Sequence, residues 1–192
     1  MKNPSSKNII LASNSPRRRM LLNYICNDFE LAPSREVDET YPAELPSDEV
    51  APFLSRKKAE AYRDLLTDDN LIITADTVVI LDGKILGKPA NGDEAMQMLG
   101  RLNGRSHSVI TGVTLMSKEK TKTFAVLSKV TFDNMTTDEL LDYISEYRPF
   151  DKAGSYGVQE WIGARGIKHI EGCYYNIMGL PLNALYNELK TF

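Results

Sequence analysis

Runs of apolar residues alternate with polar and proline-rich stretches along the chain. Continuous apolar, β-branched runs predict buried strands, and apolar residues at helical spacing behind capping residues predict helices. The expected strands cover 8–12, 29–31, 71–81, 84–86, 107–116, 123–132 and 168–171. The expected helices cover 16–26, 47–65 and 137–147, with Asp48 and Glu49 in the first turn of the second. A further helix is capped by Asn91 and runs to 102, and Pro181 opens a final helix.

Two segments carry neither pattern. The first, 33–46, holds three prolines and many polar residues, so we expect a loop. The second, 148–166, is rich in glycine and polar side chains, and we expect it to be mostly a functional loop. Strands and helices interleave, with hairpins beside crossovers, which predicts an α/β fold with a mixed sheet.

Composition narrows the class of protein. A length of 192 residues fits one domain, or two lobes that share a core. The formal net charge of −3 argues against a general nucleic-acid binder, which needs a basic field. Cys26 and Cys173 lie far apart without metal-ligand spacing, which favours a reducing compartment. No apolar run suits a signal peptide or a membrane span, so we expect a soluble, cytoplasmic protein.

Asp76 interrupts a strongly apolar strand. Because side chains alternate along a strand, Asp76 shares a face with Ile72, Thr74, Val78 and Ile80. Burying a carboxylate is costly unless it is paired or binds a cation. It is therefore either a structural aspartate with a partner, one at a strand end facing solvent, or a functional group.

Lys58 interrupts a helical stripe in the same way. Val50, Leu54, Ala61 and Leu65 occupy the other positions of that stripe. A lysine there either extends its ammonium to solvent, which is the commoner outcome, or meets an anion. We expect its neighbour on the chain, Lys57, to have an ordinary solvated role.

A basic stretch lies between the first strand and the first helix. Ser15 is a good N-cap and Pro16 a good first helical residue. Ser13, Ser15, Arg17 and Arg18 add hydroxyl and guanidinium donors where backbone N–H groups already favour anions. The stretch predicts a phosphate site; the alternative is a solvated basic turn. It is not a Walker loop, and its lack of glycine also ranks a nucleotidyltransferase loop low.

Other candidate residues are weak when taken singly. Lys88 follows the hairpin that the Asp76 strand begins, and Glu39 lies in the proline-rich loop. His107 and His169 are isolated from each other, so a zinc site is not indicated. Oxygen ligands favour a hard ion such as Mg²⁺ or Mn²⁺.

Taken together and in order, these pieces resemble the Maf family of nucleoside triphosphate pyrophosphatases from end to end. No single piece would suffice, but their number and order make the match specific. The matching stretches are 11–18, 38–39, 58–59, 75–79, 87–89, 107–112, 151–159 and 179–182.

The resemblance implies a fold and a reaction. The fold is of the Maf/ITPase type, a single domain over 1–192 with an elongated mixed β-sheet flanked by helices and a central cleft between two lobes. Many members are homodimers. The reaction is the cleavage of a nucleoside triphosphate, with a divalent metal, into the monophosphate and pyrophosphate. No nucleic acid or membrane partner is implied.

The resemblance also implies roles for residues. Asp76 matches the proposed general base, and Glu39 matches a glutamate proposed to act with it on the metal or the water. Lys58 and Lys88 match lysines that bind phosphates. The residues that match the phosphate and nucleotide loop are Ser13, Ser15, Arg17 and Arg18.

Three positions resemble the branch that acts on dTTP and UTP: Thr77, Arg17 and Gln159. The branch acting on methylated guanosine triphosphate carries glutamine after the aspartate instead. The stretch 160–165 departs from many members, which have small residues there, and its Trp161 bears on access to the base pocket.

Two rival functions remain open at this point. One is a non-catalytic nucleotide-binding regulator related to cell division, which needs the phosphate loop but no carboxylate pair. The other is nucleotidyl transfer, which needs a second substrate.

Overall fold

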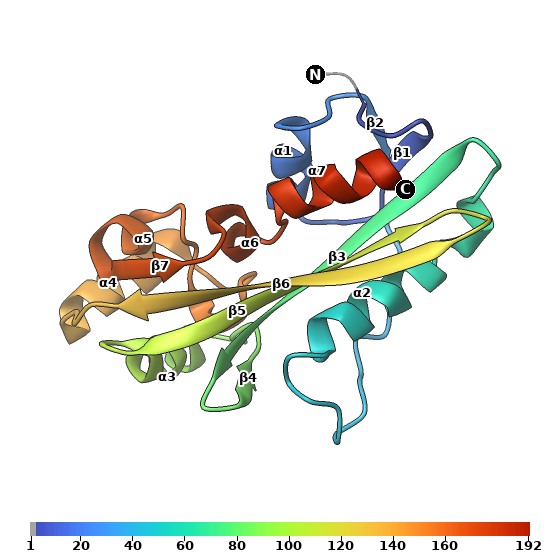
Figure 1. Ribbon diagram of the computed structural model, residues 1–192. Helices are drawn as coiled ribbons and strands as arrows, with labels where there is room; N and C mark the ends of the chain where they lie inside the picture. Colours follow the sequence, from blue (N-terminus) through green and yellow to red (C-terminus); the bar gives the residue numbers. More distant parts are fainter. Residues whose placement is uncertain (1–2) are drawn as a thin grey trace. The chain divides into compact units, whose positions relative to one another are not determined.

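The computed structural model describes residues 3–192 (Figure 1). Its strands are β1 (Asn8–Leu11), β2 (Phe29–Leu31), β3 (Asn70–Leu81), β4 (Lys84–Leu86), β5 (Ser106–Met116), β6 (Thr121–Phe132) and β7 (Ile167–Glu171). Its α-helices are α1 (Pro16–Asn23), α2 (Val50–Glu60), α3 (Gly92–Leu102), α4 (Thr137–Tyr147), α5 (Trp161–Gly166), α6 (Tyr174–Met178) and α7 (Leu182–Thr191). Two 3₁₀ turns complete the set, η1 (Arg63–Leu65) and η2 (Ala153–Ser155).

The strands form one seven-stranded sheet in the order β2-β1-β3-β5-β6-β7, with β4 paired to β3. The pairs β1–β2 and β1–β3 are parallel, whereas β3–β4 and β6–β7 are antiparallel. The expected mixed sheet flanked by helices is therefore confirmed.

The chain divides into two compact units. The first comprises the chain up to Asp76, Thr111–Val126 and Gly179–Phe192, and the second comprises Thr77–Ile110 and Leu127–Met178. The boundary falls inside β3, between Asp76 and Thr77, so these covalent neighbours belong to different units. The expected cleft stays a prediction.

In the first unit, helices cover both faces of the parallel strands. α1 and α7 lie on one side of β3 and α2 lies on the other (Figure 1). α2 approaches β5 closely, because a Cβ on Gly112 would lie 2.3 Å from the backbone nitrogen of Pro52. Only glycine permits this contact between helix and strand backbones.

In the second unit, α3 packs against α4 and η2. Its core contains a buried histidine, His107, whose Nε2 lies 2.7 Å from the Tyr156 hydroxyl. Phe132 and Tyr156 meet the imidazole edge-on. The Nδ1 atom of His107 is buried and has no hydrogen-bond partner in the described part of the chain. Burial lowers the pKa of His107 from 6.5 to about 4, because the charged ring would lose its hydration.

Two expectations about elements were wrong in part. The helix expected over 47–65 begins only at Val50 and ends at Glu60, so Asp48 precedes it and Glu49 is its N-cap. The chain turns after Glu60 and continues as η1. The segment 148–166 is less of a loop than expected, since it contains η2 and α5. The short helix α6 was not foreseen.

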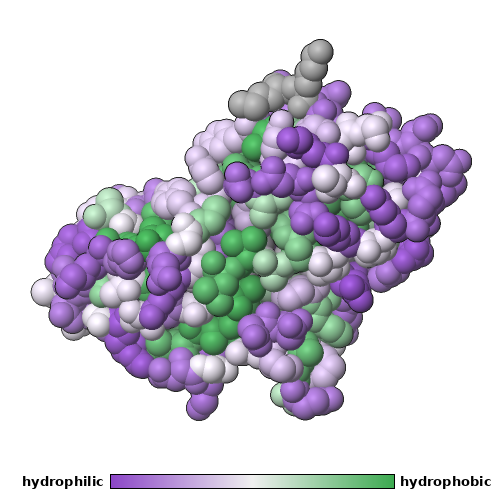
Figure 2. Space-filling model, in the orientation of Figure 1, coloured by the Kyte–Doolittle hydropathy of each residue, from purple (hydrophilic) through white to green (hydrophobic). Residues whose placement is uncertain are grey.

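Polar residues dominate much of the surface visible in Figure 2, with an apolar area among them. No helix within residues 3–192 has the length and apolar character needed to cross a membrane.

Candidate active site

Asp76 lies where β3 extends past the end of its neighbour. The register of β1 with β3 ends at Leu11 and Ile73, and the Ala12 N–H adds one more bond to the Ile73 carbonyl. The pairing of β3 with β4 begins only at Val79, so between Ile73 and Val79 β3 has no strand partner on that side within residues 3–192. The Asp76 side chain is buried at this carboxyl-terminal edge, where ligands bind in open α/β sheets.

Lys58 of α2 joins the two candidate carboxylates. Its Nζ lies 2.5 Å from Asp76 Oδ1 and 2.8 Å from Glu39 Oε1. Thr74 Oγ1 donates to the Ser55 carbonyl at 2.7 Å, which fixes α2 against β3 next to this pair. Lys58 thus meets anions, and the commoner solvent-directed orientation expected for a lone lysine is wrong here.

A second, more exposed pair holds the loop that carries Glu39. Lys57 Nζ lies 2.8 Å from Asp38 Oδ2 and donates to the Thr40 carbonyl at 2.9 Å. The Thr40 N–H and hydroxyl both donate to the Asp38 carboxylate. Hydrogen bonds from Lys57 and then Thr40 hold the pKa of Asp38 well below its usual range. The solvated role expected for Lys57 was wrong, and no local signal in the sequence pointed to its pairing with Asp38.

The basic stretch after β1 has the expected local structure. The Ser15 hydroxyl caps α1 by accepting from the Arg18 N–H, and Pro16 is the first helical residue. The Ser15 N–H donates to Ser13 Oγ at 3.2 Å. Arg18 Nε donates to the Gly179 carbonyl at 2.9 Å. Burial lowers the pKa of Arg18, and the negative charges of Asp76 and Glu39 oppose this, so the guanidinium stands in the field of the carboxylates.

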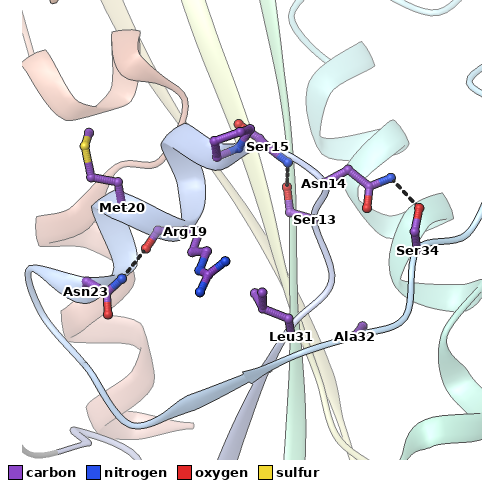
Figure 3. A pocket seen from close by; sticks show the side chains of 10 residues that line it. Ser13, Asn14, Ser15, Arg19, Met20, Asn23, Leu31, Ala32 and Ser34 are labelled. Carbon is purple, nitrogen blue, oxygen red and sulfur yellow. Dashed lines mark hydrogen bonds between the residues drawn. The ribbon is translucent and has the colours of Figure 1, made fainter.

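A pocket of about 500 Å³ opens beside this stretch (Figure 3). Arg19 directs its guanidinium into the pocket, and the Asn14 amide donates to Ser34 Oγ at 2.9 Å on its far side. Met20 and Leu31 supply an apolar wall. The volume is within the range of small-molecule sites, so a ligand held at Ser13 and Ser15 has room to extend.

The second unit carries the candidate residues Thr77, Lys88 and Gln159. The Gly154 N–H donates to the Gly87 carbonyl at 3.0 Å, which ties the turn before Lys88 to the 151–160 segment. Gly154, at φ +69°, lies against Val79 of β3, on the same strand as Thr77. Lys88 and Gln159 are both exposed and accessible to a ligand.

Comparison with known proteins decides the family. The sequence profile of the family described as "Maf-like protein" matches residues 8–192. The chain belongs to the Maf family. Within it, a relative from Bacteroides thetaiotaomicron named "dTTP/UTP pyrophosphatase" is 51% identical over 182 residues, covering 95% of this chain and 94% of the relative. A relative of the same name from Parabacteroides distasonis is 47% identical over the full length of both.

The fold of this Maf-family chain also resembles a solved structure. The Ham1 protein of Staphylococcus aureus superposes with a TM-score of 0.57, covering 96% of this chain and 99% of that one, at 16% sequence identity. At that identity the likeness concerns the fold alone, and it confirms the ITPase-type architecture expected from the sequence.

The donor set of this Maf-family site suits a hard cation. In the described residues no three His, Cys, Asp or Glu side chains converge. Two carboxylates, Asp76 and Glu39, do meet at one positive charge, the Lys58 ammonium. Mg²⁺ is commonly held by one or two carboxylates together with phosphate oxygens. The residues therefore fit a divalent ion that binds together with a polyphosphate. In the structure, the Lys58 ammonium lies between the two carboxylates that would hold this ion.

Proposed function

We propose that this protein hydrolyses nucleoside triphosphates between the α- and β-phosphates, with dTTP and UTP as its preferred substrates. The observation that carries the proposal is the buried Asp76 carboxylate, paired with Lys58 beside Glu39. Near-full-length relatives named dTTP/UTP pyrophosphatases support the choice of reaction and bases. Such chemistry suits a cytoplasmic enzyme acting on free nucleotides; the homodimer implied by the family resemblance stays a prediction.

Cationic residues hold the triphosphate. Lys58 lies at the carboxylates, while Arg17 and Arg18 follow the capped start of α1. Lys88, which is exposed, matches a further phosphate-binding lysine of the family. Fixed positive charges of this kind stabilise the negative charge that spreads over the phosphoryl oxygens in the transition state.

Asp76 acts as the general base. It accepts the proton of the water that attacks the α-phosphorus, and the pyrophosphate leaves. Burial keeps the carboxylate poorly hydrated, so that it interacts strongly with groups brought to it. Asp76 and Glu39 would hold Mg²⁺ or Mn²⁺, which when bound polarises phosphoryl oxygens and makes water more acidic. With a cation held there, Lys58 would bind phosphate oxygens instead of the two carboxylates.

Gln159 reads the base, with Arg17 and Thr77 as further contacts. A glutamine amide offers a donor and an acceptor, which suits the O4/N3–H edge of uracil or thymine. Cytosine reverses that pattern, and a buried polar group left unpaired costs about 1–3 kcal/mol. We therefore expect CTP to be a poorer substrate and purine nucleotides poorer still.

A panel of nucleoside triphosphates tests the proposed function. With Mg²⁺ or Mn²⁺ present, dTTP and UTP should yield the monophosphate and pyrophosphate, and a chelator should stop the reaction. The measurement is chromatographic identification of both products. Release of orthophosphate with the diphosphate, or a rate that depends on an added acceptor, would contradict the assignment.

A further inference from the structure

A buried ion pair lies next to Gln159 in the second unit. Lys152 Nζ is 3.1 Å from Glu160 Oε1, with only 10% and 16% of the two side chains exposed. Lys152 also contacts Asp151 Oδ1 at 2.8 Å. Replacing a buried ion pair by apolar residues is often neutral or stabilising, so stability alone does not account for this one. What it provides is a fixed position for Glu160.

The other oxygen of Glu160 extends the contact back to the loop. The Tyr143 hydroxyl donates to Glu160 Oε2 and accepts from the Gly157 N–H at 3.1 Å. Burial, and then the hydrogen bond to Glu160, raise the pKa of Tyr143, so its phenol stays protonated and remains the donor. These contacts form a continuous chain from Lys152 through Glu160 and Tyr143 to the backbone N–H of Gly157, two residues before Gln159. We call this chain the Glu160 clamp.

The side chains of Gln159 and Glu160 fold back over Gly157. A Cβ placed on Gly157 would lie 2.8 Å from Glu160 Oε2 and 2.9 Å from Gln159 Nε2. The amide nitrogen thus lies in the neighbourhood of a carboxylate. A negative charge attracts the N–H end of an amide and repels its carbonyl oxygen.

We propose that Glu160 is a positioning residue for base selection: its carboxylate, fixed by Lys152 and Tyr143, sets which end of the Gln159 amide faces the substrate. This rests on the proposed function, in which Gln159 contacts the base. With one Nε2 hydrogen drawn to Glu160, the carbonyl oxygen faces the base and accepts the N3–H of uracil or thymine, and the second Nε2 hydrogen remains to donate to O4. Cytosine presents an unprotonated N3 to that oxygen and is rejected.

The decisive experiment neutralises Glu160 and keeps its shape. Glu160→Gln should lower the ratio of kcat/KM for UTP over CTP by about tenfold, chiefly by improving CTP, because an uncharged neighbour no longer orients the amide. Asp82→Asn is the matched control: it is the same acid-to-amide change at an exposed ion pair with Arg105 in the same unit. It should leave the ratio within about twofold of wild type.

A second variant tests the clamp without using activity. Tyr143→Phe removes the hydroxyl that accepts from the Gly157 N–H, so hydrogen exchange at that amide should become about tenfold faster or more. The UTP over CTP ratio should fall in this variant too.

The possible outcomes distinguish a failure of the positioning role of Glu160 from a failure of the proposed function. An unchanged ratio in Glu160→Gln and in Tyr143→Phe, in an enzyme that releases pyrophosphate from UTP, overturns the positioning role and leaves the proposed function standing. Unchanged exchange at Gly157 in Tyr143→Phe overturns the clamp itself. A wild-type protein that releases no pyrophosphate from any triphosphate overturns the proposed function and, with it, base selection by Gln159.

Discussion

Asp76→Asn should lower kcat for UTP hydrolysis by about 10³-fold or more while nucleotide binding is retained. The amide has nearly the same shape as the carboxylate and can still accept a hydrogen bond from Lys58 Nζ. It cannot take a proton from water, and it offers a cation no negative charge. Lys58 and the arginine loop remain to hold phosphates, so the loss should fall on turnover.

Turnover and binding must be measured separately. Single-turnover kinetics give the chemical step, and calorimetric titration with UTP gives binding. Asp142→Asn, an exposed change on α4, is the control and should retain the wild-type rate. Full activity in Asp76→Asn would contradict the general-base role. Binding without turnover in the wild-type protein would favour the non-catalytic regulator.

The largest effect on stability should come from pH acting on His107. The folded-state pKa is about 4 against 6.5 for the unfolded chain, so between these values the unfolded state binds more protons. Stability is therefore complete above about pH 6.5 and is lost as the pH falls towards 4. The free energy of unfolding should be about 2–3 kcal/mol lower at pH 4.5 than at pH 7.5 from this group.

The structural reason lies in the surroundings of the ring. Protonation would place a charge between Phe132 and Tyr156 and make both ring nitrogens N–H donors, although the buried Nδ1 atom has no partner in the described residues. Asp38 affects stability in a different pH range. Its pKa is lowered by Lys57 and Thr40, so the stabilisation from these contacts is lost only as the pH falls below the ordinary value of 3.8. The two effects can therefore be separated along the pH axis.

Denaturant unfolding of His107→Gln across this range checks the effect. The variant should lose most of the slope between about pH 6.5 and 4.5, whatever its absolute stability. His169→Gln is the matched control, since His169 is exposed on β7, and it should keep the wild-type slope. Equal slopes in all three proteins would contradict the assignment to His107.

Residues that break a local pattern could be predicted from the sequence. Asp76 in an apolar strand and Lys58 in an apolar helical stripe each need an opposite charge, and the structure pairs them. Ser15 and Asn91 cap the helices expected to follow them, because capping depends on neighbouring residues alone. Features that depend on residues close together in the chain can therefore be predicted from a single sequence.

Contacts that depend on tertiary packing could not be predicted. The pairing of Lys57 with Asp38, and of Lys152 with Glu160, depends on how separate segments meet. The 148–166 segment seemed irregular because its glycines suggest turns. In the structure, Gly163 instead allows α5 to pack on the Val158 carbonyl, where a Cβ would not fit. Glycine content alone does not distinguish a close contact from a turn.

Hydrolysis of UTP in H₂¹⁸O tests the central claim most directly. If the water activated by Asp76 attacks the α-phosphorus, the products are UMP and pyrophosphate, and mass spectrometry will find the ¹⁸O in UMP. Label in the pyrophosphate would place the attack on the β-phosphorus. Label in orthophosphate, with UDP as the other product, would place it on the γ-phosphorus, and either result would contradict the account.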